Sequence, residues 1–260
     1  MTYTTARRFG LVTIVLLLTV TLIGSNDPHA VDLQNRLSGA SLTHPLGTDH
    51  LGRDLATRLA WGALPSLLAI GIVLTGGIII GLLAGSCLSL GSGSLRHLVS
   101  WFAQTAITIP TLVTALVLSA AFGAGTLTIA MALLLTSWAP YALTIGALFD
   151  RIRAEPYWQA SRAMGVPGYA AVYSHLLPNA WPTLGAMVGA DAGRAVIVVA
   201  SLGFIGLSAD TGRPEWGAMI LEYRMFLFTE PRLVLAPVAA CAAVAFLLNT
   251  GLDRDATRYR

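Results

Sequence analysis

Lysine is absent from this chain of 260 residues, and charged residues of every kind make up only 11% of it. The P-loop that cradles nucleotide phosphates has the form G-x-x-x-x-G-K-[ST] and needs a lysine, so the chain carries no such ATP site of its own. Soluble domains usually contain about 25% charged residues. With 55% hydrophobic residues and a mean hydropathy of +0.70, the composition indicates a polytopic membrane protein.

Cysteine and the common catalytic motifs are also scarce. Cys87 and Cys241 are the two cysteines, and both lie within apolar runs, which favours small buried side chains over a disulfide. The apolar runs contain no H-E-x-x-H, no pair of aspartates and no serine–histidine arrangement typical of hydrolases. An intramembrane enzyme is therefore disfavoured.

Uncharged runs set the number of membrane spans, since a helix needs about 20 apolar residues to cross the hydrocarbon core. The runs lie at Phe9–Gly24, Trp61–Leu95, Leu98–Phe149 and Leu233–Leu252, and a further one, at about 183–207, is interrupted only by Asp191 and Arg194. The run of 98–149 is long enough for a helical hairpin of roughly 98–122 and 126–148, with Gly-Ala-Gly at the turn. The sequence therefore predicts an all-α fold with six transmembrane helices.

The first run follows two arginines and also resembles a signal peptide, but no small-x-small cleavage site follows Gly24. A retained signal-anchor helix is favoured, and cleavage would leave five spans. We thus expect residues 1–62 to form this anchor and an extracytoplasmic segment, 63–252 the transmembrane domain, and 253–260 a tail.

Arginine placement gives the orientation. With six spans, the side that holds both termini and the loop of 149–182 carries nine arginines against four acidic residues, and the opposite side carries six against eight. The positive-inside rule places the termini and this loop in the cytoplasm.

Glycine recurs every four residues in two of the spans, which allows helix backbones to approach closely. Packing within the bundle is favoured over a dedicated dimer face. The two series are Gly77, Gly81 and Gly85, and Gly185, Gly189 and Gly193.

A polar insertion, Tyr157–Pro178 (YWQASRAMGVPGYAAVYSHLLP), lies between apolar runs. Small residues around Ala160 suit close docking of a first short helix. Gly165 is expected to end it, because glycine adopts positive φ without steric cost. A second short helix is expected at about 169–176, with Pro178 ending it. Such a kinked pair could fill a cleft on a soluble partner. An amphipathic helix resting on the bilayer is disfavoured because only Arg162 gives the segment basic character.

These residues resemble a known family. Gln159-Ala160-Ser161, then Gly165, then Leu176-Leu177-Pro178 is similar to the EAA loop of ABC-importer permeases. HPLGTDHLGRDLATRLAWGA (His44–Ala63) resembles the L-G-T-D-x-x-G-R-D segment of the dipeptide, oligopeptide and nickel permeases. ASLGFIGL and RPEWGAM (200–207 and 213–219) resemble their L-S-F-L-G-L-G and P-x-W-G-A stretches. The resemblance covers residues from about 40 to 220 in the family's order.

The chain departs from the family pattern at three places. Gln159 stands where glutamate is frequent, Gly203 stands where serine is usual, and Thr-Gly-Arg replaces a proline-rich turn. The glutamine removes a possible ion pair with the partner but keeps hydrogen-bonding capacity, so docking is expected to survive on packing.

The resemblance implies a permease subunit of a binding-protein-dependent importer in the bacterial inner membrane, without bond chemistry of its own. The coupling loop, about 151–178, would dock on a cytoplasmic ATPase. Its implied contact residues are Gln159, Ala160, Ser161, Gly165, Leu177 and Pro178. Implied partners are a homologous permease, two ABC ATPase subunits that bind ATP and Mg, an extracytoplasmic substrate-binding protein and lipid. No nucleic acid partner, cofactor or metal is expected on this chain, and the cargo would be peptides, nickel or metal chelates.

Asp191 and Arg194 are the charged residues within a predicted span. Their i,i+3 spacing puts them on one helical face, where they can pair. Lining the translocation path and locking two helices together are equally favoured. The alternative function, a secondary transporter driven by an ion gradient, needs a titratable intramembrane carboxylate, and only Asp191 is available.

Residues 25–60 and 208–232 are expected to face the substrate-binding protein. Acidic side chains there either steer its docking or belong to ordinary solvated loops; they are Asp210, Glu215, Glu222 and Glu230. A metal site built from His44, His50, Asp49 and Asp54 is disfavoured against a packed turn followed by a polar helix, because no closed ligand set with zinc spacing appears.

Overall fold

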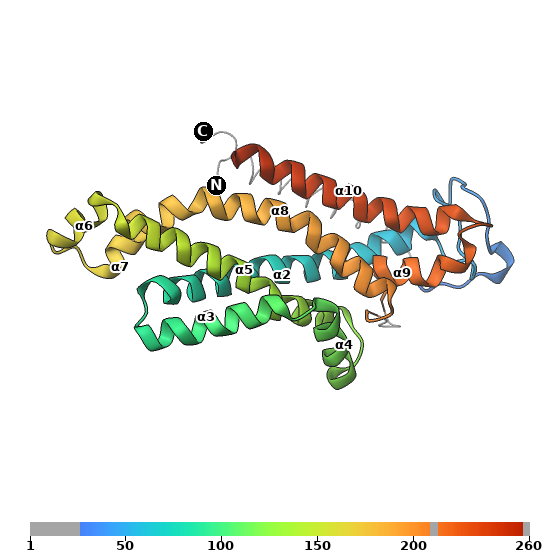
Figure 1. Cartoon of the computed structure of the whole chain (residues 1–260). Helices are drawn as coiled ribbons and strands as arrows, with labels where there is room; N and C mark the ends of the chain where they lie inside the picture. The colour runs from blue at the N-terminus through green and yellow to red at the C-terminus, as the bar shows by residue number, and fades with distance from the viewer. Residues whose placement is uncertain (1–26, 209–212, 257–260) are drawn as a thin grey trace.

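A computed structural model describes residues 27–208 and 213–256 (Figure 1). The predicted first span, Phe9–Gly24, lies outside these residues, as do its role as a signal anchor and the tail beyond 256. The total of six spans therefore stays a prediction.

The described part of the chain is helical and contains no strand beyond one isolated bridge, which confirms the all-α class. The elements in order are η1 (Leu33–Asn35), α2 (Leu55–Leu90), α3 (Gly93–Thr108), α4 (Thr111–Phe122), α5 (Thr126–Ala154), α6 (Pro156–Ala163), α7 (Gly168–Ala171), the π-helical η2 (Val172–Leu176), α8 (Leu177–Phe204), α9 (Trp216–Tyr223), η3 (Arg224–Phe226) and α10 (Pro231–Ala256).

Four stretches are long and apolar enough to cross a membrane, and the bent pair α3 and α4 would make a fifth. The four are Leu55–Leu90, Thr126–Ala154, Val172–Phe204 and Pro231–Asn249. The first begins at Leu55, ahead of the predicted domain boundary at 63.

The predicted single helix of 98–122 is wrong, because α3 and α4 meet at an angle of 92°. Ile109 is extended (φ −78°, ψ 121°) and Pro110 follows it. Proline lacks the N–H that would continue α3, and it disfavours helical geometry at the preceding residue. The predicted turn at 123–125 is confirmed, since α4 ends at Phe122 and Gly123 has a φ of +88°.

Close packing of α2 on α5 depends on the first glycine series. A Cβ on Gly81 would lie 2.4 Å from Cβ of Tyr141, and one on Gly85 would lie 2.7 Å from Cβ of Ile145. In the second series, Gly193 of α8 faces Asn249 of α10, 2.6 Å from where a Cβ would stand. These contacts confirm packing within the bundle for the first series and for Gly193, whereas no atom lies within 4 Å of a Cβ on Gly185.

Two buried apolar clusters hold the helices together. The larger cluster joins α2, α5, α8, α9 and α10. The smaller one, here called the inner cluster, lies between α5, α6 and the start of α8. It consists of Tyr141, Ile145, Phe149, Ile152, Trp158, Ala171, Leu176, Ala180 and Leu184.

The polar insertion forms the kinked pair that the sequence predicts, but its second helix does not end at Pro178. The chain is helical from Gly168 through η2 and into α8, with Pro178 in the first turn of α8. Leu177 N donates to the Val172 carbonyl five residues earlier. This widened π turn lets the helix pass the proline, whose ring would otherwise press on the carbonyl four residues before it. The α6–α7 element and α9 lie at opposite ends of the bundle (Figure 1).

Candidate functional site: the α6–α7 element and a pocket between α2, α5 and α8

Helix α6 ends in a Schellman turn built on Gly165. The φ of Gly165 is +80°, which confirms the predicted break. Its N–H donates to the Arg162 carbonyl (3.1 Å), and the N–H of Val166 donates to the Ser161 carbonyl (3.2 Å). These two bonds satisfy carbonyls that a helix end leaves open, so the backbone leaves α6 in one defined direction.

The inward face of α6 is fixed to the rest of the chain. Trp158 is only 8% exposed and belongs to the inner cluster. Its ring lies edge-on to His175 of η2, with 6.3 Å between centroids, and Tyr157 packs on the same imidazole at 5.6 Å. Ser161 is also buried on this face. Buried Trp158 thus attaches α6 to α5 and to the helix that runs from η2 into α8.

Most of the residues predicted to contact an ATPase are exposed. Gln159, Ala160, Gly165 and Pro178 are exposed. Leu177 is half-buried against the inner cluster, and Ser161 is buried. An exposed Met164, at 77% of its surface, follows Ala163 at the helix end and was not singled out from the sequence.

The base of the element is tied to two neighbouring helices by a charged cluster that the sequence did not reveal. Asp150 of α5 accepts hydrogen bonds from Ser89 Oγ (2.7 Å) and from Arg96 of α3 (2.9 Å). Arg153 donates to the Ser89 carbonyl near the end of α2. Arg153 lies in the last turn of α5, three residues before α6 begins at Pro156. The neighbouring ends of α2, α3 and α5 are therefore joined next to the α6–α7 element.

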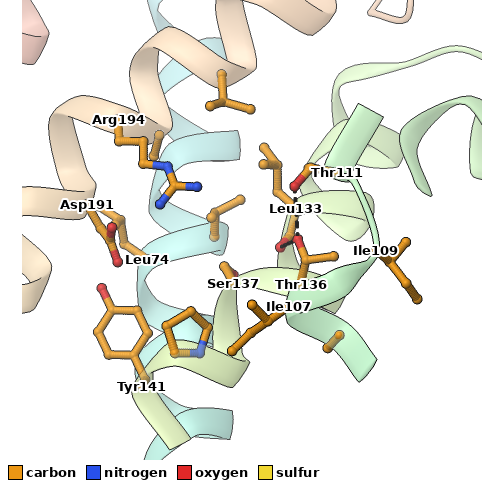
Figure 2. Close-up of a pocket in the computed structure, with 15 residues that line it drawn as sticks. Leu74, Ile107, Ile109, Thr111, Leu133, Thr136, Ser137, Tyr141, Asp191 and Arg194 are labelled. Carbon is orange, nitrogen blue, oxygen red and sulfur yellow. Dashed lines mark hydrogen bonds between the residues drawn. The ribbon is translucent and has the colours of Figure 1, made fainter. Parts of the chain in front are cut away.

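A pocket of about 240 Å³ opens between α2, the α3–α4 bend, α5 and α8. Asp191 and Arg194 both line it (Figure 2). The guanidinium of Arg194 points into the space, and the hydroxyl of Tyr141 points toward the Asp191 carboxylate. Figure 2 shows no hydrogen bond between Asp191 and Arg194, so the pairing expected from their spacing is not made.

At the opposite end of the bundle, Asp49 is fully buried and sits at the centre of a second charged network. It accepts from Arg53 Nε (2.7 Å), Arg58 Nη1 (2.9 Å) and the Tyr223 hydroxyl (3.0 Å). Both arginines also donate to Glu222 of α9. The network fastens the segment before α2 to α9.

The charges around these carboxylates lower their pKa values. Burial raises the pKa of Asp49, but hydrogen bonds from the Leu51 and Arg53 backbone and the Arg53 charge outweigh it and hold the pKa below its ordinary value. Burial likewise raises the pKa of Glu222, and the hydrogen bonds and charges of Arg58 and Arg53 lower it overall. Both groups are therefore stabilised as carboxylates.

The arginines also occupy the carboxylates of a possible metal-ligand group at this end. Ligand atoms of Asp49, His50 and Glu222 lie within 4.8 Å of one another, but two guanidinium groups already occupy both carboxylates. His44 contacts Asp54 (3.1 Å), which caps α2 through the Thr57 N–H (2.7 Å). The segment is thus a packed turn leading into α2, as the sequence favoured.

Two acidic residues expected on the outer surface have other roles. Glu215 is only 2% exposed. It caps α9 by accepting from the N–H groups of Gly217 and Ala218, and it also accepts from the hydroxyls of Ser66 and Ser208. Glu222 belongs to the network with Arg53 and Arg58. Neither is available to steer a partner, and Asp210 lies outside the described residues.

The chain resembles known transport proteins over most of its length. The family described as "Binding-protein-dependent transport system inner membrane component" matches residues 77–256. The nickel transport system permease protein NikC of Escherichia coli (strain K12) is 32% identical over 95% of this chain and 92% of that protein. The metal-staphylopine import system permease protein CntC of Staphylococcus aureus is 29% identical over 88% of this chain and 79% of that protein.

Solved structures share the fold. The MetNI methionine ABC transporter in inward-facing conformations aligns with a TM-score of 0.61 at 18% identity, over 76% of this chain and 94% of that chain. An amino acid ABC transporter aligns with a TM-score of 0.54 at 21% identity, over 77% and 92% of the two chains. The motif resemblance found in the sequence is confirmed, and the chain belongs to the inner-membrane permeases of binding-protein-dependent ABC importers, in the group with peptide and nickel members.

Proposed function

We propose that this chain is the permease subunit of an ATP-driven importer for nickel or a metal chelate, and that α6 couples it to a separate ATPase. The observation that carries this proposal is the continuous packing between the coupling element and the pocket. The inner cluster begins at Trp158 of α6 and ends at Tyr141, which lines the pocket. The chain has no P-loop, so ATP and Mg are bound by partner subunits.

In the proposed mechanism, closure of two ATPase subunits displaces α6. Because Trp158 is buried between α5 and η2, the displacement reaches α5 and α8 as a rigid-body movement. Packed helices of this kind switch between discrete arrangements rather than deforming continuously. The pocket between α5 and α8 then opens alternately to the two sides of the membrane.

The other partners follow from the surfaces of the chain. Apolar side chains are exposed along α3 and α4, among them Trp101, Phe102 and Val117, and they offer surface to lipid and to a homologous permease. The end that faces an extracytoplasmic binding protein is formed by α9 together with the segment that precedes α2. With α6 on the ATPase side, both termini are cytoplasmic, in agreement with the arginine distribution. The proposed cargo follows by analogy with the relatives, whose names specify nickel and metal–staphylopine.

An ion-driven secondary transporter is not favoured. Such a mechanism needs an intramembrane carboxylate that titrates or binds the coupling ion. Asp191 shares its pocket with the guanidinium of Arg194, whose positive charge repels a coupling cation.

The test is uptake by the reconstituted complex of this chain with its partner permease, both ATPases and the binding protein. In proteoliposomes with the ATPases facing the lumen, ATP enclosed with them should drive uptake of radioactive nickel supplied outside with a chelator and the binding protein, ATP added only outside should not, and enclosed vanadate should stop the uptake. Uptake that follows an imposed proton or sodium gradient without ATP would contradict the proposal.

A further inference from the structure

We infer that the ATPase partner places an acidic side chain in a positively charged hollow between the end of α5 and α6. The inference rests on the proposed coupling role of α6 and names the chemistry of the partner at that surface. The residues that line the hollow are Asp150, Arg153, Ala154, Trp158, Gln159 and Arg162.

The first argument is an excess of positive charge. Two arginines and one aspartate line the hollow. The aspartate is already paired, since Asp150 accepts from Arg96 at 2.9 Å and also lies 3.8 Å from Arg153. Arg162 is exposed, its Nη1 donates to the neutral Val166 carbonyl, and it forms no ion pair within the described part of the chain. A carboxylate from another subunit would therefore meet an uncompensated guanidinium.

The second argument is unused hydrogen-bonding capacity. A guanidinium has five N–H donors, and the contact of Arg162 with Val166 occupies its Nη1 alone. The Nε of Arg153 is buried and has no partner among the described residues. The amide of Gln159 donates one N–H to the Ala154 carbonyl (3.4 Å), which leaves its second N–H for a ligand. The open groups of these three side chains are chiefly donors, and an ionised carboxylate is purely an acceptor.

The third argument is the glutamine at position 159. Gln159 and Arg162 are three residues apart on α6, so a carboxylate at position 159 would be able to pair with the arginine on the same helical face. The neutral amide does not cancel that charge. A glutamate here would call for a basic residue on the ATPase, whereas the arginine charge left by the glutamine calls for an acidic one.

The position of the hollow favours a soluble partner over a lipid headgroup. Helix α6 belongs to none of the described stretches that are long and apolar enough to cross a membrane, and it projects past the ends of α2 and α3 (Figure 1). The hollow is also continuous with the surface expected to contact the ATPase, because the exposed Gln159 belongs to both.

The first test measures binding of the cognate ATPase subunits to the detergent-solubilised pair of permeases at low salt. Arg162→Gln should raise the Kd about tenfold, since a hydrogen bond between charged groups is lost, and added salt should reduce the difference. Gln159→Glu should raise the Kd as well, because the new carboxylate would neutralise Arg162 and repel the incoming acid. Arg151→Gln is the matched control, because Arg151 is exposed nearby but does not line the hollow, and its Kd should stay within twofold of wild type.

The second test identifies the partner residue. The chain contains no lysine, so Arg162→Lys introduces its first side-chain amine and keeps the positive charge. In the assembled complex, a carbodiimide should condense this amine with a carboxylate, and mass spectrometry should locate the bond at an aspartate or glutamate of the ATPase. Arg151→Lys should give no such product.

The outcomes separate this inference from the proposed function. A complex that assembles and hydrolyses ATP, but in which Arg162→Lys gives no cross-link to the ATPase, would overturn the inference and leave the coupling role of α6 standing. Tighter ATPase binding by Gln159→Glu would also overturn it. A wild-type Kd in Arg162→Gln, together with loss of co-purified phosphatidylglycerol, would overturn it by assigning the hollow to a lipid headgroup. If the ATPase subunits do not bind the wild-type permease pair, the proposed function fails and the inference fails with it.

Discussion

Replacing Gly165 with valine changes the backbone geometry of the coupling element without crowding it. No atom lies within 4 Å of the position that a Cβ would take, so the side chain itself meets no obstacle. The φ of +80° is the source of the cost. Left-handed geometry costs an L-residue roughly 1–2 kcal/mol, and a β-branched residue lies at the upper end. Since 1.4 kcal/mol is a factor of ten, the Schellman turn should become about 5- to 30-fold less populated relative to its alternatives.

The loss of this turn should uncouple transport from ATP hydrolysis. The assay is the number of substrate molecules taken up per ATP hydrolysed by the reconstituted complex, with the amount of permease in the membrane measured in parallel. Valine should lower this ratio several-fold at unchanged permease abundance. Gly165→Asn is the matched control, because asparagine tolerates left-handed geometry, and it should retain most of the coupling. An unchanged ratio in the valine variant would show that α6 does not act through a stiff turn.

Three further outcomes follow from the contacts. Gly85→Val should reduce the amount of folded protein in the membrane, since a Cβ there lies 2.7 Å from Ile145 and overpacking costs about 1–3 kcal/mol; Gly71→Val, on the same helix in open space, should not, and equal yields would contradict the packing. Thermal stability should fall as the pH drops below about 4, because Asp49 and Glu222 have lowered pKa values in the folded protein and their stabilisation, complete above the ordinary carboxyl pKa, is lost on protonation; Glu222→Gln should flatten the profile, and a slope identical to wild type would refute this assignment. Asp150→Asn should lower the uptake per ATP while leaving insertion intact, because it weakens the link of α5 to α2 and α3; a wild-type ratio would remove the cluster from the coupling route.

Local sequence patterns predicted the parts of the fold that depend on local chemistry. The break at Gly165 and the turn at 123–125 follow from glycine at positions where a helix must end. Pro110 is also a local signal for the bend between α3 and α4, but the uninterrupted apolar run around it favoured one straight span. Pro178 led to the opposite error: a helix end was predicted there, but a π turn allows the helix to continue past the proline.

The contacts between distant segments could not be predicted in this way. Arg58 and Glu222 are 164 residues apart, and no periodicity links them. Glu215 was expected in solvent, as isolated acidic residues usually are, but four donors from α2, α9 and the end of α8 make its burial possible. Asp191 and Arg194 were correctly identified as polar residues within a span. Their lack of a mutual salt bridge depends on how the two side chains are oriented on α8, which their spacing does not fix.

Site-directed cross-linking of α6 tests whether this helix is the contact with the ATPase. With Cys87 and Cys241 replaced by alanine, Ala160→Cys presents a thiol on the exposed face of α6, and Ser161→Cys places one on the buried face. In the assembled complex, the thiol at 160 should cross-link to an ATPase subunit and uptake should then stop, whereas the thiol at 161 should not react. Failure of position 160 to reach any ATPase subunit, or its labelling from the outer face of the cell, would contradict the coupling role of α6.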